Sequence, residues 1–252
     1  MEQILPPGST VYYIFGVAFM FFLGISAGNY ATSLVYRLPR GLKIANDPPY
    51  CECSRQMYLG VRDLFPFFSW LANKGQCRFC DIKIPAIYTV IEFLSGFLFV
   101  HTWLTYGIGE EFILILAIDI FLMIQAAIYF DHKKLTNIVL VAIIACAAVY
   151  RTLLDGTIFG FVQSGYMALM LILVVWGVEM LLKRKKTPFP DYAVFFFVGA
   201  IALPKGELIA YFIIAFIVSL ISYGLSCISK KFSDAAWMFG ITASVMMALS
   251  HG

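Results

Sequence analysis

Two aspartates stand where acid/base chemistry can take place in an otherwise apolar chain. Asp131 ends one long apolar run and Asp191 begins another. Two carboxyls in a poorly solvated cleft share charge reluctantly, so one tends to stay protonated while the other activates water for attack on an amide. This is general acid/base peptide hydrolysis. Position alone slightly favours the alternative, in which each aspartate caps a helix end or lies beside a basic cluster.

The residues around this pair are those of a membrane protein. The chain is 61% hydrophobic and 13% charged, and its mean hydropathy is +0.85. A spanning helix needs about 20 apolar residues, and the runs that come near this length predict an all-α polytopic membrane protein with about eight transmembrane helices. They cover residues 11–35, 84–106, 112–130, 138–154, 158–182, 189–203, 208–228 and 235–249. We expect the short sixth run to leave Asp191 near a thinned or wetted boundary.

The lysines and arginines predict which ends of these spans face the cytoplasm. With the N-terminus outside, sixteen of the 18 fall on the inner side, as the positive-inside rule requires. This topology puts both termini outside and both aspartates on the cytoplasmic side. Residues 1–10 carry no basic residue, which favours a retained first span over a cleaved signal peptide. Orientation and anionic lipid explain the basic run at 183–186, so we expect no nucleic-acid partner.

The predicted cytosolic loop between the first and second spans, residues 39–83, contains two close cysteine pairs. These are Cys51, Cys53, Cys77 and Cys80. In a reducing compartment such pairs hold a metal more often than they form structural disulfides. Four thiolates predict a tetrahedral zinc site. The remaining cysteines, Cys146 and Cys227, lie in apolar runs, where we expect them to pack as small apolar side chains.

Three other polar residues in or beside the predicted spans need an interpretation: Glu92, Asp119 and His132. Glu92 lies about two turns inside the second predicted span, where it is either functional or hydrogen-bonded to a neighbouring helix. Asp119 would lie about 18 Å deeper than Asp131 at helical rise, so we expect a buried neutral acid outside the pair. His132 either tunes the charge of Asp131 or faces water and headgroups.

Several short motifs, in this order, resemble one family. They are Gly28 with 36–39 (Tyr-Arg-Leu-Pro), 63–66 (Asp-Leu-Phe-Pro), 75–80 (Gly-Gln-Cys-Arg-Phe-Cys), 88–96 around Glu92, and Gly199 eight residues after Asp191. The resemblance is to the bacterial type IV prepilin leader peptidases, which are membrane aspartyl proteases of the inner membrane. Many members also methylate the new N-terminus.

The resemblance implies a specific activity and cofactors. Asp131 and Asp191 would be the catalytic pair, cleaving the leader of type IV prepilins or pseudopilins at the cytoplasmic face for pilus or type II secretion assembly. Residues 1–38 would be the first transmembrane helix, 39–83 the cysteine-rich zinc loop and 84–252 a seven-helix peptidase region. Methylation would use S-adenosylmethionine, for which the sequence has no independent motif.

The sequence departs from the family near the proposed chemistry. Pro188 and Pro190 replace glycines before Asp191, and Ala193 replaces a lysine. Proline fixes φ and lacks an N–H, so this segment has fewer conformations than a glycine turn. The sequence therefore leaves two hypotheses open: a divergent peptidase, or a catalytically degenerate relative that binds pilins as a noncatalytic membrane scaffold.

Overall fold

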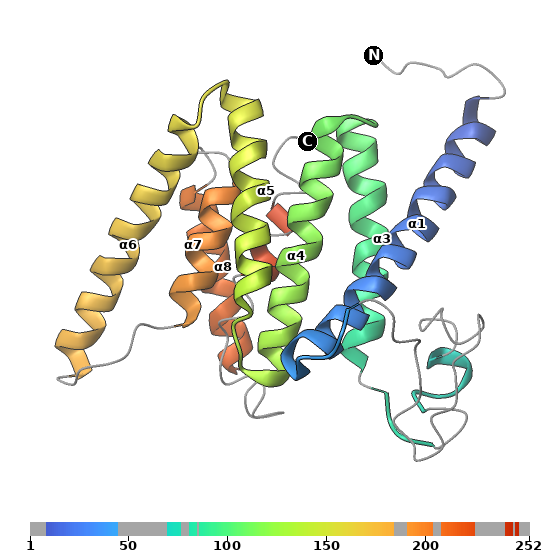
Figure 1. Ribbon diagram of the computed structural model, residues 1–252, viewed down its shortest axis with the longest axis horizontal. Coiled ribbons are helices and arrows are strands. Elements are labelled where there is room, and N and C mark those ends of the chain that lie inside the picture. The colour runs from blue at the N-terminus through green and yellow to red at the C-terminus, as the bar shows by residue number, and fades with distance from the viewer. Residues whose placement is uncertain are drawn as a thin grey trace.

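The protein is all-helical in the parts that the structure describes. The computed structural model describes residues 9–44, 70–76, 81–84, 86–183, 191–203, 208–224, 240–243 and 245–246. Its helices are α1 (Ser9–Arg37), the 3₁₀ turn η1 (Leu38–Arg40), α3 (Ala86–Tyr106), α4 (Glu110–His132), α5 (Asn137–Asp155), α6 (Phe159–Lys183), α7 (Asp191–Ala202) and α8 (Leu208–Gly224). Figure 1 shows the long helices running roughly side by side as a bundle.

The described helices lie close to predicted apolar runs, for example α4 at Glu110–His132 against the run at 112–130. Within the described residues, four helices are long and apolar enough to cross a membrane, namely Tyr13–Arg40, Ala86–Tyr106, Glu110–His132 and Asn137–Asp155. The predicted sixth run is the 12-residue α7, about 18 Å long and therefore shorter than a bilayer core of about 30 Å. The predicted eighth span falls largely outside the described residues, as do all four cysteines of the two pairs.

Close packing of α1 on α3 depends on small residues. A Cβ at Gly24 would lie 2.7 Å from Gly96 Cα, and one at Gly28 would lie 2.7 Å from Glu92 Cα. Only glycine allows the backbones to approach so closely, as in other small-xxx-small helix contacts in membranes. The two glycines thus fix α1 against the half of α3 that contains Glu92.

Helix α4 is the centre of the bundle. Of its apolar window, 72% is buried, against 28–39% for the other three candidate spans. It contacts α1, α3 and α5, and α5 in turn contacts α6 and α7. The side chains along residues 122–129 of α4 are all buried. The part of α4 that precedes its last turn is therefore packed on several sides.

The C-terminal end of α5 contains a buried cation. Arg151 is 1% exposed. Its Nη2 lies 2.9 Å from Asp155 Oδ2, one helical turn along α5. A Cβ at Gly160 of α6 would collide with Asp155, so that glycine makes room for the ion pair. This cluster lies at the end of α5 remote from the loop that joins α5 to α4.

Candidate functional site

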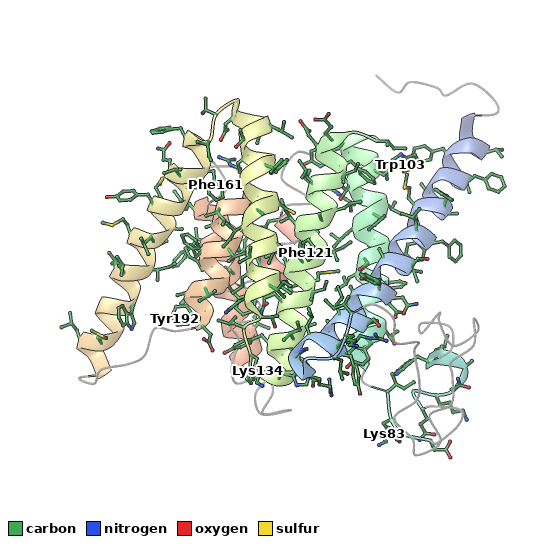
Figure 2. The ribbon with its side chains drawn as sticks, in the orientation of Figure 1. Lys83, Trp103, Phe121, Lys134, Phe161 and Tyr192 are labelled. Atoms are coloured by element: carbon green, nitrogen blue, oxygen red, sulfur yellow. The ribbon has the colours of Figure 1, made fainter. Side chains whose placement is uncertain are left out.

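The elements that carry the two predicted aspartates meet at one end of the bundle. Asp131 lies in the last turn of α4, and Asp191 is the first residue of α7. Figure 2 shows Lys134 and Tyr192, close neighbours of these aspartates in sequence, at the lower end of the bundle, while Trp103 and Phe161 lie at the opposite end. Lys83 also lies toward the lower end. Asp191 and the last turn of α4, which contains Asp131, therefore lie toward the same end of the described bundle.

Asp191 is bound to α4 by a short hydrogen bond. The hydroxyl of Tyr129 donates to Asp191 Oδ2 at 2.7 Å, across 62 positions of sequence. Asp191 also stands at the N-terminal end of α7, where a carboxylate interacts favourably with the helix dipole. The bond therefore joins the first turn of α7 to the last turn of α4, the turn that also contains Asp131.

Tyr129 is held firmly by its surroundings. It is 3% exposed, and its ring meets the ring of Phe195 from α7 edge to face, with centroids 5.3 Å apart. The ammonium of Lys133 lies 5.2 Å from the centre of the Tyr129 ring. The backbone N–H of Lys133 donates to the Tyr129 carbonyl at 2.9 Å. The hydroxyl is therefore presented to Asp191 by a ring with little freedom to move.

Asp131 lies beside His132, which in turn lies near Arg40 of the 3₁₀ turn η1. Its Oδ2 is 3.7 Å from His132 Nε2, and the Asp131 side chain is 20% exposed. Arg40 Nη1 approaches the same His132 nitrogen at 3.4 Å. The Arg40 guanidinium also lies 3.9 Å over the Tyr36 ring. The motif at 36–39 that resembles the family thus ends next to the first predicted catalytic aspartate.

The loop after Asp131 is folded back on α4. Lys133 takes φ 53°, the left-handed conformation that ends the helix. Gln125 accepts from the backbone N–H of Thr136 at 3.1 Å and donates to the Lys134 carbonyl at 3.4 Å. The buried side-chain amide of Gln125 thus hydrogen-bonds to both Lys134 and Thr136 of this short loop. The chain leaves Asp131 along a fixed path into α5.

The described residues beside the second cysteine pair are held together. Gln76 and Lys83 form an antiparallel bridge, and Ile84 donates to the Gly75 carbonyl at 2.9 Å. The Trp70 indole donates to the Ile84 carbonyl at 3.1 Å. Cys77 and Cys80 fall between these paired residues in sequence but outside the described residues, as do Cys51 and Cys53. Among the described residues alone, no cluster of three metal-ligating side chains occurs.

Two other acids of the predicted spans, Glu92 and Asp119, are fully buried, as the sequence suggested for Asp119. Glu92 and Asp119 are both 0% exposed. Glu92 lies where Gly28 of α1 contacts α3. Asp119 lies three turns before Asp131, in the middle of α4. Neither is in the last turn of α4, where Tyr129 meets Asp191.

Sequence reasoning missed three residues of this site: Gln125, Tyr129 and Arg40. The signal for Tyr129 was a hydroxyl within an apolar run, two positions before Asp131. A buried tyrosine usually finds a partner for its hydroxyl. The partner itself has no local signature, because it comes from a helix that begins 62 residues later.

The chain is similar to bacterial prepilin-processing enzymes. Residues 22–106, from within α1 to the end of α3, match the bacterial peptidase A24 N-terminal domain. The prepilin leader peptidase/N-methyltransferase of Myxococcus xanthus is 30% identical over 115 residues, 45% of this chain and 34% of its own length. The type 4 prepilin-like proteins leader peptide-processing enzyme of Escherichia coli is 29% identical over 90 residues, 36% and 32% of the two chains.

A third relative covers more of the chain. The prepilin leader peptidase/N-methyltransferase of Vibrio cholerae is 29% identical over 147 residues, 55% of this chain and 57% of its own length. The chain thus spans about a third of the first two relatives and little more than half of this one. No solved structure matches the chain.

Proposed function

We propose that this chain, which belongs to the prepilin peptidase A24 family, is a membrane aspartyl endopeptidase that cleaves the leader peptide of type IV prepilins or pseudopilins. Its substrate would present a short basic leader followed by a hydrophobic helix, and cleavage would fall at their boundary. The reaction would take place at the cytoplasmic face of the bacterial inner membrane. It would release the helix for pilus or type II secretion assembly.

The observation that carries the proposal is the hydrogen bond from Tyr129 to Asp191. A dyad needs both carboxyls near one point, and this bond ties α7 to the turn of α4 that contains Asp131. Asp191 is exposed, so water can reach the carboxylate that Tyr129 holds. A carboxylate that is held in place and open to water supports the catalytic use proposed for Asp191.

Each part of the site has a role in the proposed hydrolysis. Asp131 and Asp191 share the activation of a water molecule and the protonation of the leaving amine. Arg40, which approaches His132, stands on the Asp131 side, where its permanent positive charge offsets part of the negative charge of the pair. Gln125 keeps the loop after Asp131 in one conformation. These groups keep the reacting carboxyls in place without moving during the reaction.

Zinc would be a structural cofactor of the cysteine-rich loop. The four thiolates of Cys51, Cys53, Cys77 and Cys80 form a donor set that suits tetrahedral zinc. The bridge between Gln76 and Lys83 fits this assignment, because it draws together the described ends of the segment that carries the second pair. Zinc would cross-link the loop and take no part in hydrolysis.

One pocket among the described residues does not suit S-adenosylmethionine. The pocket between α3 and α4 is lined by apolar side chains: Ile87, Val90, Ile91, Leu94, Met123, Ala127, Phe130 and Ile241. A charged sulfonium cofactor with a polar amino acid end does not suit such a lining. We assign no residue to this cofactor and derive no methylation step.

A scaffold that binds pilins without cutting them is the second candidate function. It is favoured by Pro188, Pro190 and Ala193, which stand where the family has glycines and a lysine. Ala193 is 0% exposed in the core, so this position contributes no cation. A scaffold would keep the α4 and α7 packing but leave the prepilin intact.

The test is direct cleavage of a prepilin from the same genome. Purified protein in liposomes is mixed with the prepilin, and mass spectrometry reads the new N-terminus. We expect the leader to be removed by the wild type and to remain with Asp131→Ala and with Asp191→Ala. Binding of prepilin without cleavage by a folded wild type would support the scaffold.

A further inference from the structure

We propose that Tyr129 is a positioning residue for Asp191, an inference that rests on the proposed peptidase function. Asp191 follows a segment whose prolines replace the glycines of related enzymes. A carboxyl at the start of a 12-residue helix needs a second point of attachment to keep one geometry. The Tyr129 hydroxyl supplies that point at 2.7 Å from Oδ2.

The ring of Tyr129 gives the hydroxyl a fixed direction. Phe195, one turn along α7 from Asp191, meets the ring edge to face with centroids 5.3 Å apart. Lys133 lies 5.2 Å from the ring centre on the α4 side. Both contacts involve the ring and neither involves the hydroxyl. The ring therefore aligns α7 with α4, while the hydroxyl sets the orientation of the Asp191 carboxyl.

The position of Tyr129 relative to Asp131 adds to this role. Two residues of helix separate them by about 3 Å along the axis and by about 200° around it. The side chains of Tyr129 and Asp131 therefore leave α4 in nearly opposite directions. Tyr129 reaches Asp191 of α7, while Asp131 lies beside His132 in the same turn of α4.

The substitution Tyr129→Phe tests the role of the hydroxyl separately from that of the ring. Tyr129→Phe keeps the ring and its contacts with Phe195 and Lys133, and it removes only the donor to Asp191. The matched control is Tyr211→Phe. Tyr211 is also fully buried, and its hydroxyl also binds α7, but through the Phe195 carbonyl at 3.5 Å and not through a carboxylate.

The kinetic constants kcat and KM distinguish a positioning role of Tyr129 from a role in folding. Because misplacing a reacting group lowers the rate of the chemical step more than substrate binding, Tyr129→Phe should lower kcat about 10- to 100-fold and leave KM within about twofold. Tyr211→Phe should leave both near the wild-type values. Equal kcat for Tyr129→Phe and wild type would overturn the proposal, and so would equal losses in the two tyrosine variants.

A second measurement does not depend on cleavage. Asp191 is labelled in native membranes with a carbodiimide and an amine, and peptide mass spectrometry reads the rate. Losing its hydrogen-bond donor should make the carboxyl at least about threefold more reactive in Tyr129→Phe, and Tyr211→Phe should match the wild type. Faster labelling in an enzyme that cleaves nothing supports the Tyr129 contact and contradicts the peptidase function. Unchanged labelling, or the same increase in Tyr211→Phe, overturns the role of Tyr129 whatever the activity.

Discussion

Gly28 of α1 lies directly on the backbone of Glu92 in α3, where an added Cβ would stand 2.7 Å from Glu92 Cα. The contact places a fully buried glutamate against the helix that leads to Arg40. Since Arg40 approaches His132 beside Asp131, the packing of α1 on α3 also sets the distance between the end of α1 and the candidate site.

Gly28→Ala should therefore destabilise the protein. The added methyl meets backbone that cannot rotate away, and overpacking of this kind costs about 1–3 kcal/mol. The loss is measured as a lower Tm in detergent. Gly177→Ala in α6 is the control, because a Cβ there has open space around it and alanine is the better helix former. A Tm for Gly28→Ala at or above that of Gly177→Ala would contradict the packing.

The proposed dyad predicts that each aspartate is indispensable. Asp131→Asn and Asp191→Asn keep the shape of the side chain but cannot exchange the proton, so cleavage should fall about a thousandfold or more. The rate of leader removal in matched membrane preparations measures the loss. Asp81→Asn is the control: Asp81 is exposed in the loop, and asparagine tolerates its φ of 57°.

Each of the two variants, Asp131→Asn and Asp191→Asn, tests the assignment of its own residue to the dyad. Normal cleavage by one of them, at equal expression, would remove that residue from the dyad and leave the other assignment to be judged alone. Loss of cleavage in Asp81→Asn would point to general damage by changes at this end of the protein.

The zinc assignment predicts metal in the purified protein. We expect about one zinc per chain, which is lost when Cys77 and Cys80 are both changed to serine, because serine is a poor zinc ligand at neutral pH. Elemental analysis after chelator-free preparation measures it. Cys146→Ser is the control, since this cysteine is partly buried against the core of α5 and its neighbours. Wild-type protein without zinc would refute the assignment.

The sequence predicted the helices better than their contacts, for physical reasons. The run at 112–130 became α4 at Glu110–His132, because an apolar run of that length in a membrane has to satisfy its backbone internally. The prediction that Asp131 and Asp191 share one side followed from the basic residues. The bond between Tyr129 and Asp191 did not, because a contact across 62 residues depends on how α4, α5 and α7 pack.

The prolines before Asp191 distinguish an enzyme from a scaffold. Pro188 and Pro190 narrow the conformations of the segment, so they either preorganise Asp191 for the contact with Tyr129 or hold it away from Asp131. If the protein is an enzyme, changing both Pro188 and Pro190 to glycine should lower the rate of cleavage several-fold, because the Asp191 carboxyl gains conformational freedom. In a scaffold it should create cleavage that the wild type lacks.

The measurement is leader removal from the same prepilin by the wild type and by the Pro188→Gly, Pro190→Gly double variant. Combining the double variant with Tyr129→Phe adds a control for the site. If the prolines and the Tyr129 hydroxyl restrain Asp191 together, either restraint suffices when the other is lost. In that case the free energy of activation should rise more in the triple variant than the sum of the two separate increases. Additive losses would mean that the two act on different groups, and an efficient wild-type enzyme would exclude the scaffold.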